Sequence, residues 1–349
     1  SSSLSSGVVG LNDPFANDFF DSTDPSSPTS LSTISETTND TNPVISGTAE
    51  ANSTVEVFSD GSSLGTTAAD SDGNWSYTPS SNLSDGTHTI TATATDAAGN
   101  KSYPSSGLSI TIDSSAPSTP ATPDLAADSD TGSSDLDNIT SNTTPTFTGT
   151  AEEGSEVNIF SDKSFGNIFI LIGTTTADDV GDWSFSHSSY FSSLVPGTQM
   201  ISAMGIDVAG NFSAPSNVLI ITIDPFAPST PTTPDLATAS DSGSSDSDNI
   251  TSNTTPTFTG TAETDSTVEV FSDGSSLGMT TADSKGDWTF TVSSALDVGI
   301  FAITAIASDT AGNVSNASSE LTITISESFT VRASLDTAVA AWIADPTAA

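Results

Sequence analysis

The chain repeats itself. The word DNITSNTTPTFTGTAE occurs at 137–152 and again at 248–263, and a shorter form of its end, GTAE, stands at 47–50. Self-similarity at a long period is typical of an array of equivalent units, each with a small core of its own. We therefore expect the function to belong to the row of units and not to one unique pocket.

Three other landmarks recur in the same order: a tryptophan after Gly-Asn or Gly-Asp, the word D-x-A-G-N, and a strand-like run such as LSITID. They stand at Trp75, Trp183 and Trp288, at 96–100, 207–211 and 309–313, and at 108–113, 219–224 and 321–326. Units of on the order of 100 residues suffice to bury one core each. We divide the chain into a linker or docking segment (1–30), module 1 (31–113), module 2 with an acidic entry linker (114–224), module 3 with an acidic entry linker (225–326), and the truncated start of a further domain (327–349).

Apolar residues alternate with Thr and Ser, which is the pattern of half-buried strands. In 87–96 the alternation places Ile90, Ala92 and Ala94 on one side, and the other modules repeat it from Ile201 and from Ile303. About seven such strands per module, separated by Gly, Asn, Asp and Pro turns, predict an immunoglobulin-like sandwich around the tryptophan. The predicted fold class is all-β: an elongated tandem array of three such sandwiches.

The composition excludes several classes of function. The formal charge is −40, from 44 acidic residues against 4 basic ones, so the surface repels nucleic acid and anionic membranes. With no cysteine there is no disulfide or thiolate metal site. No apolar run approaches the roughly 20 residues of a membrane span, so we expect no membrane insertion.

The recurring words also resemble a known family. T-x-P-x-x-x-G-T-A-E, V-E-V-F-S-D-G, D-G-x-W, D-x-A-G-N and T-I-D-x-x-A-P-x-x-P follow one another as in the immunoglobulin-like repeats of giant bacterial surface adhesins, including RTX-type adhesins. The resemblance covers about residues 31–326. It implies an extracellular, cell-surface location, calcium at the junctions, and neighbouring modules of a larger protein as partners.

Acidic residues gather where one module follows another, and no Lys or Arg lies among them. We predict that the GTAE loop, the loop before the tryptophan, D-x-A-G-N and the acidic linker all meet at the entry end of a module. Such crowded carboxylates need a counter-cation, and an all-oxygen site suits Ca²⁺. The predicted ligands at junction one are Asp113, Asp128, Asp130, Asp135, Asp137, Glu152 and Asp207, and at junction two Asp224, Asp241, Asp246, Asp248, Glu263 and Asp309, with only a subset coordinating.

Two simpler interpretations compete with the calcium site. In the first, the acidic runs are only hydrated linkers. In the second, Asp and Asn of D-x-A-G-N only close a tight loop through side-chain hydrogen bonds. Module 1 lacks the acidic entry word, and module 3 ends in Ser326 where the others have Asp113 and Asp224. We therefore predict calcium at two junctions only.

Module 2 carries two insertions that its siblings lack, one before Asp178 and one after Trp183. Both are apolar and aromatic, and we expect both at the exit end of the module. They either cover the module's own core or form a contact with another module, another chain or a ligand. The candidate contact residues are Phe165, Ile168, Phe169, Ile170, Tyr190 and Phe191.

The two ends of the chain differ from the modules. Phe15, Phe19 and Phe20 are possible docking side chains in the N-terminal segment. After Glu327, a short strand and a helix capped by Ser334 are expected, and this stretch resembles the opening of BspA-like surface-protein repeats.

Catalytic chemistry is not indicated. His88 and His187 occupy non-equivalent places, and neither lies in a metal-ligand or nucleophile motif. We predict a non-enzymatic, calcium-stiffened extender of a large extracellular adhesin. The alternatives are a carbohydrate- or protein-binding module that acts through the module 2 insertions, and a structural subunit of an extracellular filament.

Overall fold

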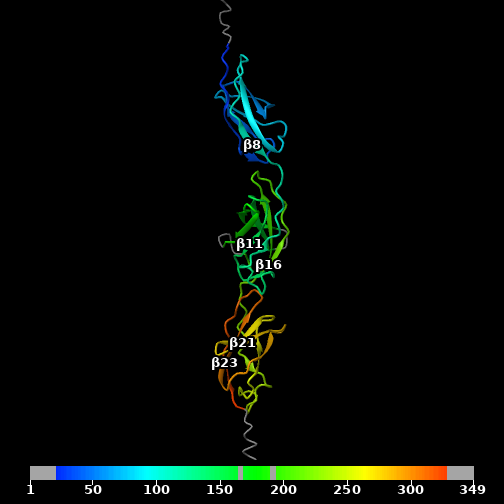
Figure 1. Cartoon of the computed structure of the whole chain (residues 1–349), viewed down its shortest axis with the longest axis vertical. Coiled ribbons are helices and arrows are strands. Elements are labelled where there is room, and N and C mark those ends of the chain that lie inside the picture. Colours follow the sequence, from blue (N-terminus) through cyan, green and yellow to red (C-terminus); the bar gives the residue numbers. More distant parts are fainter. Residues whose placement is uncertain (1–20, 164–167, 189–193, 328–349) are drawn as a thin grey trace, which may run out of the picture.

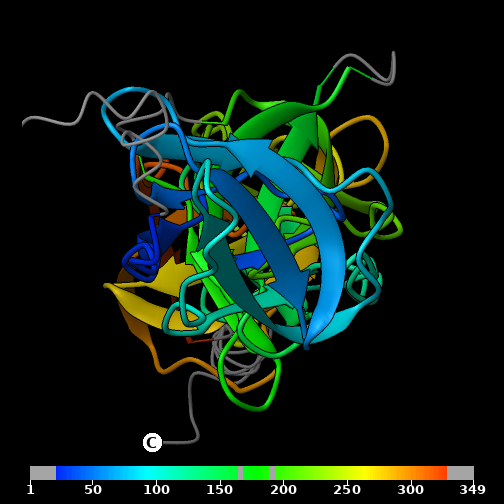
Figure 2. The ribbon, with the colours of Figure 1, turned by 90° about the horizontal axis from the view of Figure 1, so that it is seen from above.

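The computed structural model describes residues 21–163, 168–188 and 194–327. Within these residues the chain forms strands and no helix, arranged as three β-sandwiches one after another along a single long axis (Figure 1). Seen down that axis, the sandwiches lie behind one another (Figure 2). The predicted all-β tandem array is confirmed. None of the described residues builds a helix of the length and apolarity that crossing a membrane requires.

Each module has eight strands among the residues that the structure describes. Those of module 1 are β1 (Thr29–Ser32), β2 (Thr37–Thr38), β3 (Ile45–Thr48), β4 (Thr54–Ser59), β5 (Ser62–Ala68), β6 (Asn74–Tyr77), β7 (Gly86–Thr95) and β8 (Leu108–Ile112). Those of module 2 are β9 (Asp124–Leu125), β10 (Ile139–Thr140), β11 (Thr146–Thr150), β12 (Glu156–Asp162), β13 (Ile170–Thr176), β14 (Asp182–Ser186), β15 (Gly197–Ile206) and β16 (Leu219–Ile223). Those of module 3 are β17 (Asp235–Leu236), β18 (Ile250–Thr251), β19 (Thr257–Thr261), β20 (Thr267–Ser272), β21 (Ser275–Thr281), β22 (Asp287–Thr291), β23 (Gly299–Ser308) and β24 (Leu321–Ile325).

The same two sheets recur in every module. In module 2 a five-stranded sheet has the order β10-β16-β15-β12-β13, and a three-stranded sheet has the order β14-β11-β9. The first strand of the sandwich is split between the sheets, because β9 pairs antiparallel with β11 whereas β10 pairs parallel with β16. This split explains why eight strands are found where about seven are expected.

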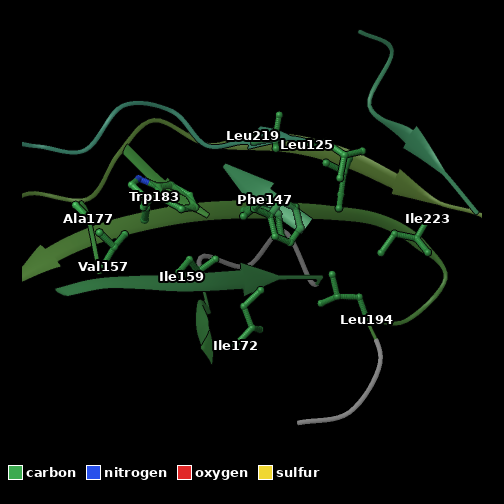
Figure 3. Packing of buried hydrophobic residues seen from close by; sticks show 13 residues of the cluster. Leu125, Phe147, Val157, Ile159, Ile172, Ala177, Trp183, Leu194, Leu219 and Ile223 are labelled. Carbon is green, nitrogen blue, oxygen red and sulfur yellow. The ribbon is translucent and has the colours of Figure 1, made fainter. Parts of the chain in front are cut away.

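The core confirms the alternation seen in the sequence. Ile90, Ala92 and Ala94 are fully buried, as are their counterparts in β15 and β23. In module 2 the core gathers around Trp183 and Phe147 between the two sheets (Figure 3). Gly149 pairs with Trp183 across β11 and β14, and a Cβ there would lie 2.6 Å from the indole ring. The glycine of each GTAE word therefore makes room for the tryptophan.

The two ends of a module are set by the hairpins. Glu156 pairs with Ile206, so the GTAE turn and the D-x-A-G-N loop share one end, the entry end. The loop before the tryptophan lies there as well, since the N–H of Ala151 donates to the carbonyl of Gly181. These three loops meet as predicted. The described residues that bracket the two module 2 insertions lie at the opposite, exit end, where Ser161 pairs with Ile170 and Gly197 pairs with Ile223.

The predicted position of the acidic words is wrong. The segment before them runs along β11 from the entry end to the exit end. The N–H of Ala121 donates to the carbonyl of Thr150, and the N–H of Ala126 donates to the carbonyl of Thr146. By residue 126 the chain has therefore passed the whole length of β11 and reached the exit end. The word at 128–137 then returns to β10, beside the end of β16. It lies at the junction after module 2, because Asp124 and Leu125 form the first strand of the sandwich and not a linker.

Several sequence predictions fall outside the described residues. These are the docking role of Phe15, Phe19 and Phe20, the helix expected after Ser334, and the contact residues Phe165, Tyr190 and Phe191. Of the remaining contact candidates, Ile168 and Ile170 are exposed at 66% and 61%, and Phe169 is half-buried.

Candidate functional site

The D-x-A-G-N loop is closed by its own aspartate. In module 2, Oδ1 of Asp207 accepts the N–H of Asn211 at 2.9 Å, and Oδ2 accepts the side-chain amide of Asn211 at 2.8 Å. Burial raises the pKa of Asp207, but the hydrogen bonds from Asn211 outweigh it, and the net pKa is lowered. Asp96 and Asp309 make the same bonds to Asn100 and Asn313. The carboxylate that was a predicted ligand thus has a loop-closing role.

The loop so closed holds the preceding module. The Nδ2 of Asn211 also donates to the main-chain carbonyl of Asp113 at 2.8 Å, the residue that follows β8 of module 1. Asn313 donates in the same way to the carbonyl of Asp224 at 2.8 Å. We call this arrangement the Asn latch. A third copy stands at the entry end of module 1, where Asn100 donates to the carbonyl of Asp21 at 2.9 Å.

A second hydrogen bond per junction comes from the exit end of the preceding module. At junction one, the N–H of Asn39 donates to the carbonyl of Ala209 at 3.1 Å. At junction two, the hydroxyl of Thr131 donates to the carbonyl of Ala311 at 2.8 Å. In both cases the acceptor is the middle of the D-x-A-G-N loop. Each junction is therefore held at two places by polar contacts that use main-chain atoms on at least one side.

The exit loops differ between the modules. Module 1 has only the short stretch between β1 and β2, whereas modules 2 and 3 carry the acidic words 128–137 and 239–248. The acidic word of module 2 reaches junction two through Thr131, and that of module 3 lies at the far end of module 3. The linker aspartates predicted for junction one are thus not beside Asp113, Glu152 and Asp207. There, Oε2 of Glu152 accepts the N–H of Ser118 at 2.9 Å.

Within the acidic word the structure separates the four carboxylates into two kinds. Asp128 and Asp135 are exposed, whereas Asp130 is 7% exposed and Asp137 is half-buried. Oδ2 of Asp130 accepts the N–H of Asn138 at 3.2 Å. Asp137 accepts from the N–H of Ile139 at 3.0 Å and from the hydroxyl of Ser133 at 3.0 Å. The loop thereby folds around two carboxylates.

Oδ1 of Asp130 is buried and has no hydrogen-bond partner among the described residues, and the same holds for Oδ1 of Asp241 in module 3. Burial, and next the negative charge of Asp137, raise the pKa of Asp130. A buried carboxylate oxygen without a donor is costly unless a cation or water meets it. A cation would stabilise this oxygen better than water would, because the negative charge of Asp137 lies beside it.

The site so formed is small. Among the residues that the structure describes, no group of three or more acidic or histidine side chains is arranged to hold a metal ion. The oxygen-only donor set of Asp130 and Asp137 suits a hard cation such as Ca²⁺ in chemistry, with main-chain oxygens or water to complete the shell. Asp241 and Asp248 form the matching pair, where the N–H of Asn249 donates to Asp241 at 3.2 Å.

The division of the strands into three modules agrees with the matches to known proteins. A family model described as bacterial Ig-like domain matches residues 18–114, 116–225 and 227–326. The chain belongs to the bacterial Ig-like domain family. It is a tandem array of three such domains, and no curated protein matches it.

Many solved structures resemble this bacterial Ig-like array. A tetra-tandem repeat from the extending region of a large adhesion protein is 23% identical, with 87% of this chain and 74% of that chain covered and a TM-score of 0.29. A Ca²⁺-stabilised adhesin with which an Antarctic bacterium binds ice is 24% identical, with 83% and 70% covered and a TM-score of 0.36. The FN1–FN3 domains of chicken CNTN1 are 12% identical, with 87% and 99% covered and a TM-score of 0.35.

Proposed function

We propose that this array of bacterial Ig-like domains is a non-enzymatic extender in the stalk of a large extracellular surface adhesin. It would hold another part of the protein away from the cell surface. The observation that supports the proposal is the Asn latch, which occurs at both junctions and again at the entry end of module 1. A latch repeated in every module serves to align modules, and a row of aligned modules makes a spacer.

The chemistry of the latch supports this role. Its acceptor is a main-chain carbonyl, so the latch is independent of the side chain at the end of the preceding module. Its donor is fixed by Asp96, Asp207 or Asp309 before the neighbour arrives, and little side-chain freedom is lost on docking. The net charge of −40 adds repulsion along the row, which favours the extended arrangement.

We further propose that Ca²⁺ strengthens junction two and the far end of module 3. The carboxylates of Asp130 and Asp137 would hold one ion, and those of Asp241 and Asp248 would hold another. The ion would neutralise the buried negative charge and would fix the acidic loop that carries Thr131. Module 1 has no acidic exit loop, so junction one depends on its hydrogen bonds. The other nine predicted ligands remain a sequence prediction.

A second candidate function is a binding module. Ile168 and Ile170 are exposed at 66% and 61% near the exit end of module 2, at positions where module 1 has no such insertion. An apolar insertion of this kind would contact a protein or a carbohydrate from the side of the stalk. Binding of a glycan array by the intact chain, abolished by Ile168→Ser with Ile170→Ser, would favour this candidate.

Small-angle X-ray scattering tests the extender. A compact domain of this length would have a radius of gyration of about 20 Å, and the extended array predicts a value well above it. With calcium, the scattering should indicate a stiff rod, and with EGTA a more flexible particle. Asp130→Asn with Asp241→Asn should give the EGTA profile in calcium, whereas Glu153→Gln, an exposed loss of one charge, should not. A compact particle in both solutions would contradict the extender. A rod whose scattering is unchanged by EGTA would contradict the calcium site alone.

A further inference from the structure

A short loop between β6 and β7 supports the exit end of module 1, beside junction one. The loop spans residues 79–85, and we call it the brace. The N–H of its Leu83 donates to the carbonyl of Thr41 at 2.8 Å, just after Asn39 in the chain. Asn39 is the residue whose N–H bonds module 2 across junction one. The brace therefore supports one of the two contacts that hold this junction.

The brace also holds the linker that leads to module 2. Oδ1 of Asp85 accepts the N–H of Ser114 at 3.0 Å and its hydroxyl at 2.8 Å. Ser114 directly follows Asp113, whose carbonyl receives the Asn latch. Modules 2 and 3 have Pro196 and Val298 at the position of Asp85, and neither side chain can accept a hydrogen bond. The bond between Asp85 and the linker is thus a feature of module 1.

His88 of β7 contacts the brace from the side of the core. It stands on the inward row of β7 with Ile90, and its side chain is 12% exposed. Its Nε2 lies 2.8 Å from the carbonyl oxygen of Ser84 on the brace, and its Nδ1 lies 2.8 Å from Oδ2 of Asp60 in the turn after β4. Both ring nitrogens therefore face acceptors. An imidazolium offers an N–H to each of them, whereas a neutral imidazole has only one N–H.

The charged group beside His88 is Asp60. Oδ1 of Asp60 accepts the N–H of Thr89 at 2.8 Å, which keeps Oδ2 beside the ring. The residue paired with His88 on β8 is Ile110, which carries no charge. On the brace the acid is Asp85, whose carboxylate is engaged by the linker. The proton on His88 is therefore favoured by one carboxylate and by the carbonyl of the brace.

Loss of that proton should release the brace. Neutral His88 keeps its remaining N–H for Asp60, because a hydrogen bond to a charged acceptor is the stronger one. The lone pair of Nε2 then faces the carbonyl oxygen of Ser84, and two acceptors at hydrogen-bond distance repel each other. Ser84 adjoins Asp85 in the chain. A shift of this carbonyl therefore moves the carboxylate that holds the linker.

Module 2 holds the corresponding position with a group that does not titrate. Gln199 stands at the position of His88, and its Nε2 donates to the carbonyl of Val195 at 2.8 Å. Its Oε1 accepts the hydroxyl of Ser161 at 3.0 Å. Val195 corresponds to Ser84, so the amide makes the same bond as the histidine. Because an amide keeps its donor and its acceptor at every pH, the histidine adds proton dependence to a contact that the fold can make without it.

We propose that junction one is a proton-controlled joint and that His88 is its switch. When His88 is charged, the brace supports Asn39 and the linker, and modules 1 and 2 stay aligned. When His88 is neutral, the brace is released and the junction bends. At junction two the exit end of module 2 carries Gln199 instead, so that joint lacks this switch. The consequence for the reach of a stalk rests on the proposed function, whereas the switch itself does not.

Spin labels on the full chain test the proposal directly. The chain has no cysteine, so Ser76→Cys in β6 and Ser184→Cys in β14 report the distance across junction one alone. The distance distribution should be narrow at about pH 5.5 and wider at about pH 8.5, on either side of the histidine titration. With His88→Gln it should be narrow at both values, and with Asp85→Ala it should be wide at both. A width that is independent of pH in the wild type, or a pH effect that persists in His88→Gln, would overturn the proposal. A distance that places modules 1 and 2 folded back on each other at both values would contradict the proposed extender instead.

The main-chain amide of Ser114 gives a second, independent measure by NMR on the unlabelled chain. Its proton shift should titrate with the same midpoint as the ring of His88, and its exchange with solvent should become faster above that midpoint. With His88→Gln the shift should stay constant over the same range. With Asp60→Asn both midpoints should fall together, because the carboxylate that favours the imidazolium is gone. A Ser114 amide that does not follow His88 would overturn the coupling between the histidine and the linker.

Discussion

The side-chain amide of Asn313 in module 3 donates a 2.8 Å hydrogen bond to the main-chain carbonyl of Asp224, the residue that follows the last strand of module 2. The same amide donates to Oδ2 of Asp309 at 2.8 Å. One side chain therefore closes its own loop and fixes the neighbouring module. Because both N–H groups of the amide are used, the loop and the junction are coupled.

Asn313→Ala should loosen junction two. It removes two hydrogen bonds, each contributing about 1 kcal/mol, and leaves the core of module 3 intact. Spin labels on Ser184→Cys in β14 and Thr289→Cys in β22 report the distance across the junction, since the chain has no cysteine of its own. The distance distribution should broaden in Asn313→Ala. The matched control is Asn316→Ala, because Asn316 is exposed and accepts a hydrogen bond from the hydroxyl of Ser315 through its main-chain carbonyl, which alanine retains. An unchanged distribution in Asn313→Ala would show that the latch does not hold the junction.

The sequence predicts the sandwiches well, because period-two alternation and repeated words depend on local rules. Val55, Val57 and Trp75 are buried as the pattern indicates. The D-x-A-G-N word also predicts a tight loop. The hydrogen bonds from Asn211 to Asp207 confirm the interpretation that this aspartate closes the loop. What the words do not reveal is the bond from Asn211 to the carbonyl of Asp113, since a main-chain acceptor leaves no trace in the sequence.

The acidic words show where local rules fail. Their position depends on whether Asp124 and Leu125 form a strand, and a two-residue strand after a proline-rich stretch gives almost no periodic signal. Once β9 is counted as a strand, the chain has crossed the module before Asp128, and the acids belong to the following junction. One signal was available in the sequence. Asp130 and Asp137 flank Gly132, where a Cβ would lie 2.6 Å from Oδ1 of Asp137, so the glycine marks a loop folded on its own carboxylates.

Gly149→Ala should destabilise module 2 by about 1–3 kcal/mol, because the new methyl group meets the indole of Trp183 at 2.6 Å in a well-packed core. Urea unfolding followed by tryptophan fluorescence measures the change. Gly205→Ala is the matched control in the same module, since the siblings carry Ala94 and Ala307 at that position and only ordinary contacts at 3.6 Å or more await a Cβ. A loss of stability in Gly205→Ala as large as in Gly149→Ala would refute the steric explanation.

Module 1 should show a pH dependence that comes from the pair of His88 and Asp60. The carbonyl of Ser84 and then the carboxylate of Asp60, 2.8 Å from Nδ1 of His88, raise the pKa of His88. The main-chain N–H of Thr89 and then His88 lower the pKa of Asp60. The histidine contribution is therefore present below its unfolded pKa of about 6.5 and is lost as the pH rises through its folded value. The aspartate contribution is present above its unfolded pKa of about 3.9 and is lost as the pH falls through its folded value.

The two windows overlap between about pH 4 and pH 6.5, so the pair contributes most there. An NMR titration should give His88 a pKa above the usual histidine value, with His88→Gln used to assign the signal. Glutamine stands at the equivalent position of module 2, as Gln199, so the variant should fold. The difference in Tm of module 1 between wild type and His88→Gln should shrink above the folded pKa of His88. A constant difference from about pH 5 to pH 8.5 would refute the linkage.

Asp130→Asn should have opposite effects with and without calcium. Without the ion, the wild type keeps a buried carboxylate oxygen that has no donor and lies beside Asp137, so removing the charge should leave the stability of module 2 equal or higher. With calcium at about 100 times its Kd, the wild type should gain about 2.7 kcal/mol through binding to the folded state, and the variant should gain much less. The stability curves of the two chains should therefore cross as calcium is added, which chemical unfolding at several calcium concentrations measures. Asp128→Asn, which removes an exposed carboxylate from the same loop, should keep most of the calcium gain. If Asp130→Asn lowered the stability equally with and without the ion, Asp130 would be a structural hydrogen-bond acceptor for Asn138 and not a cation ligand.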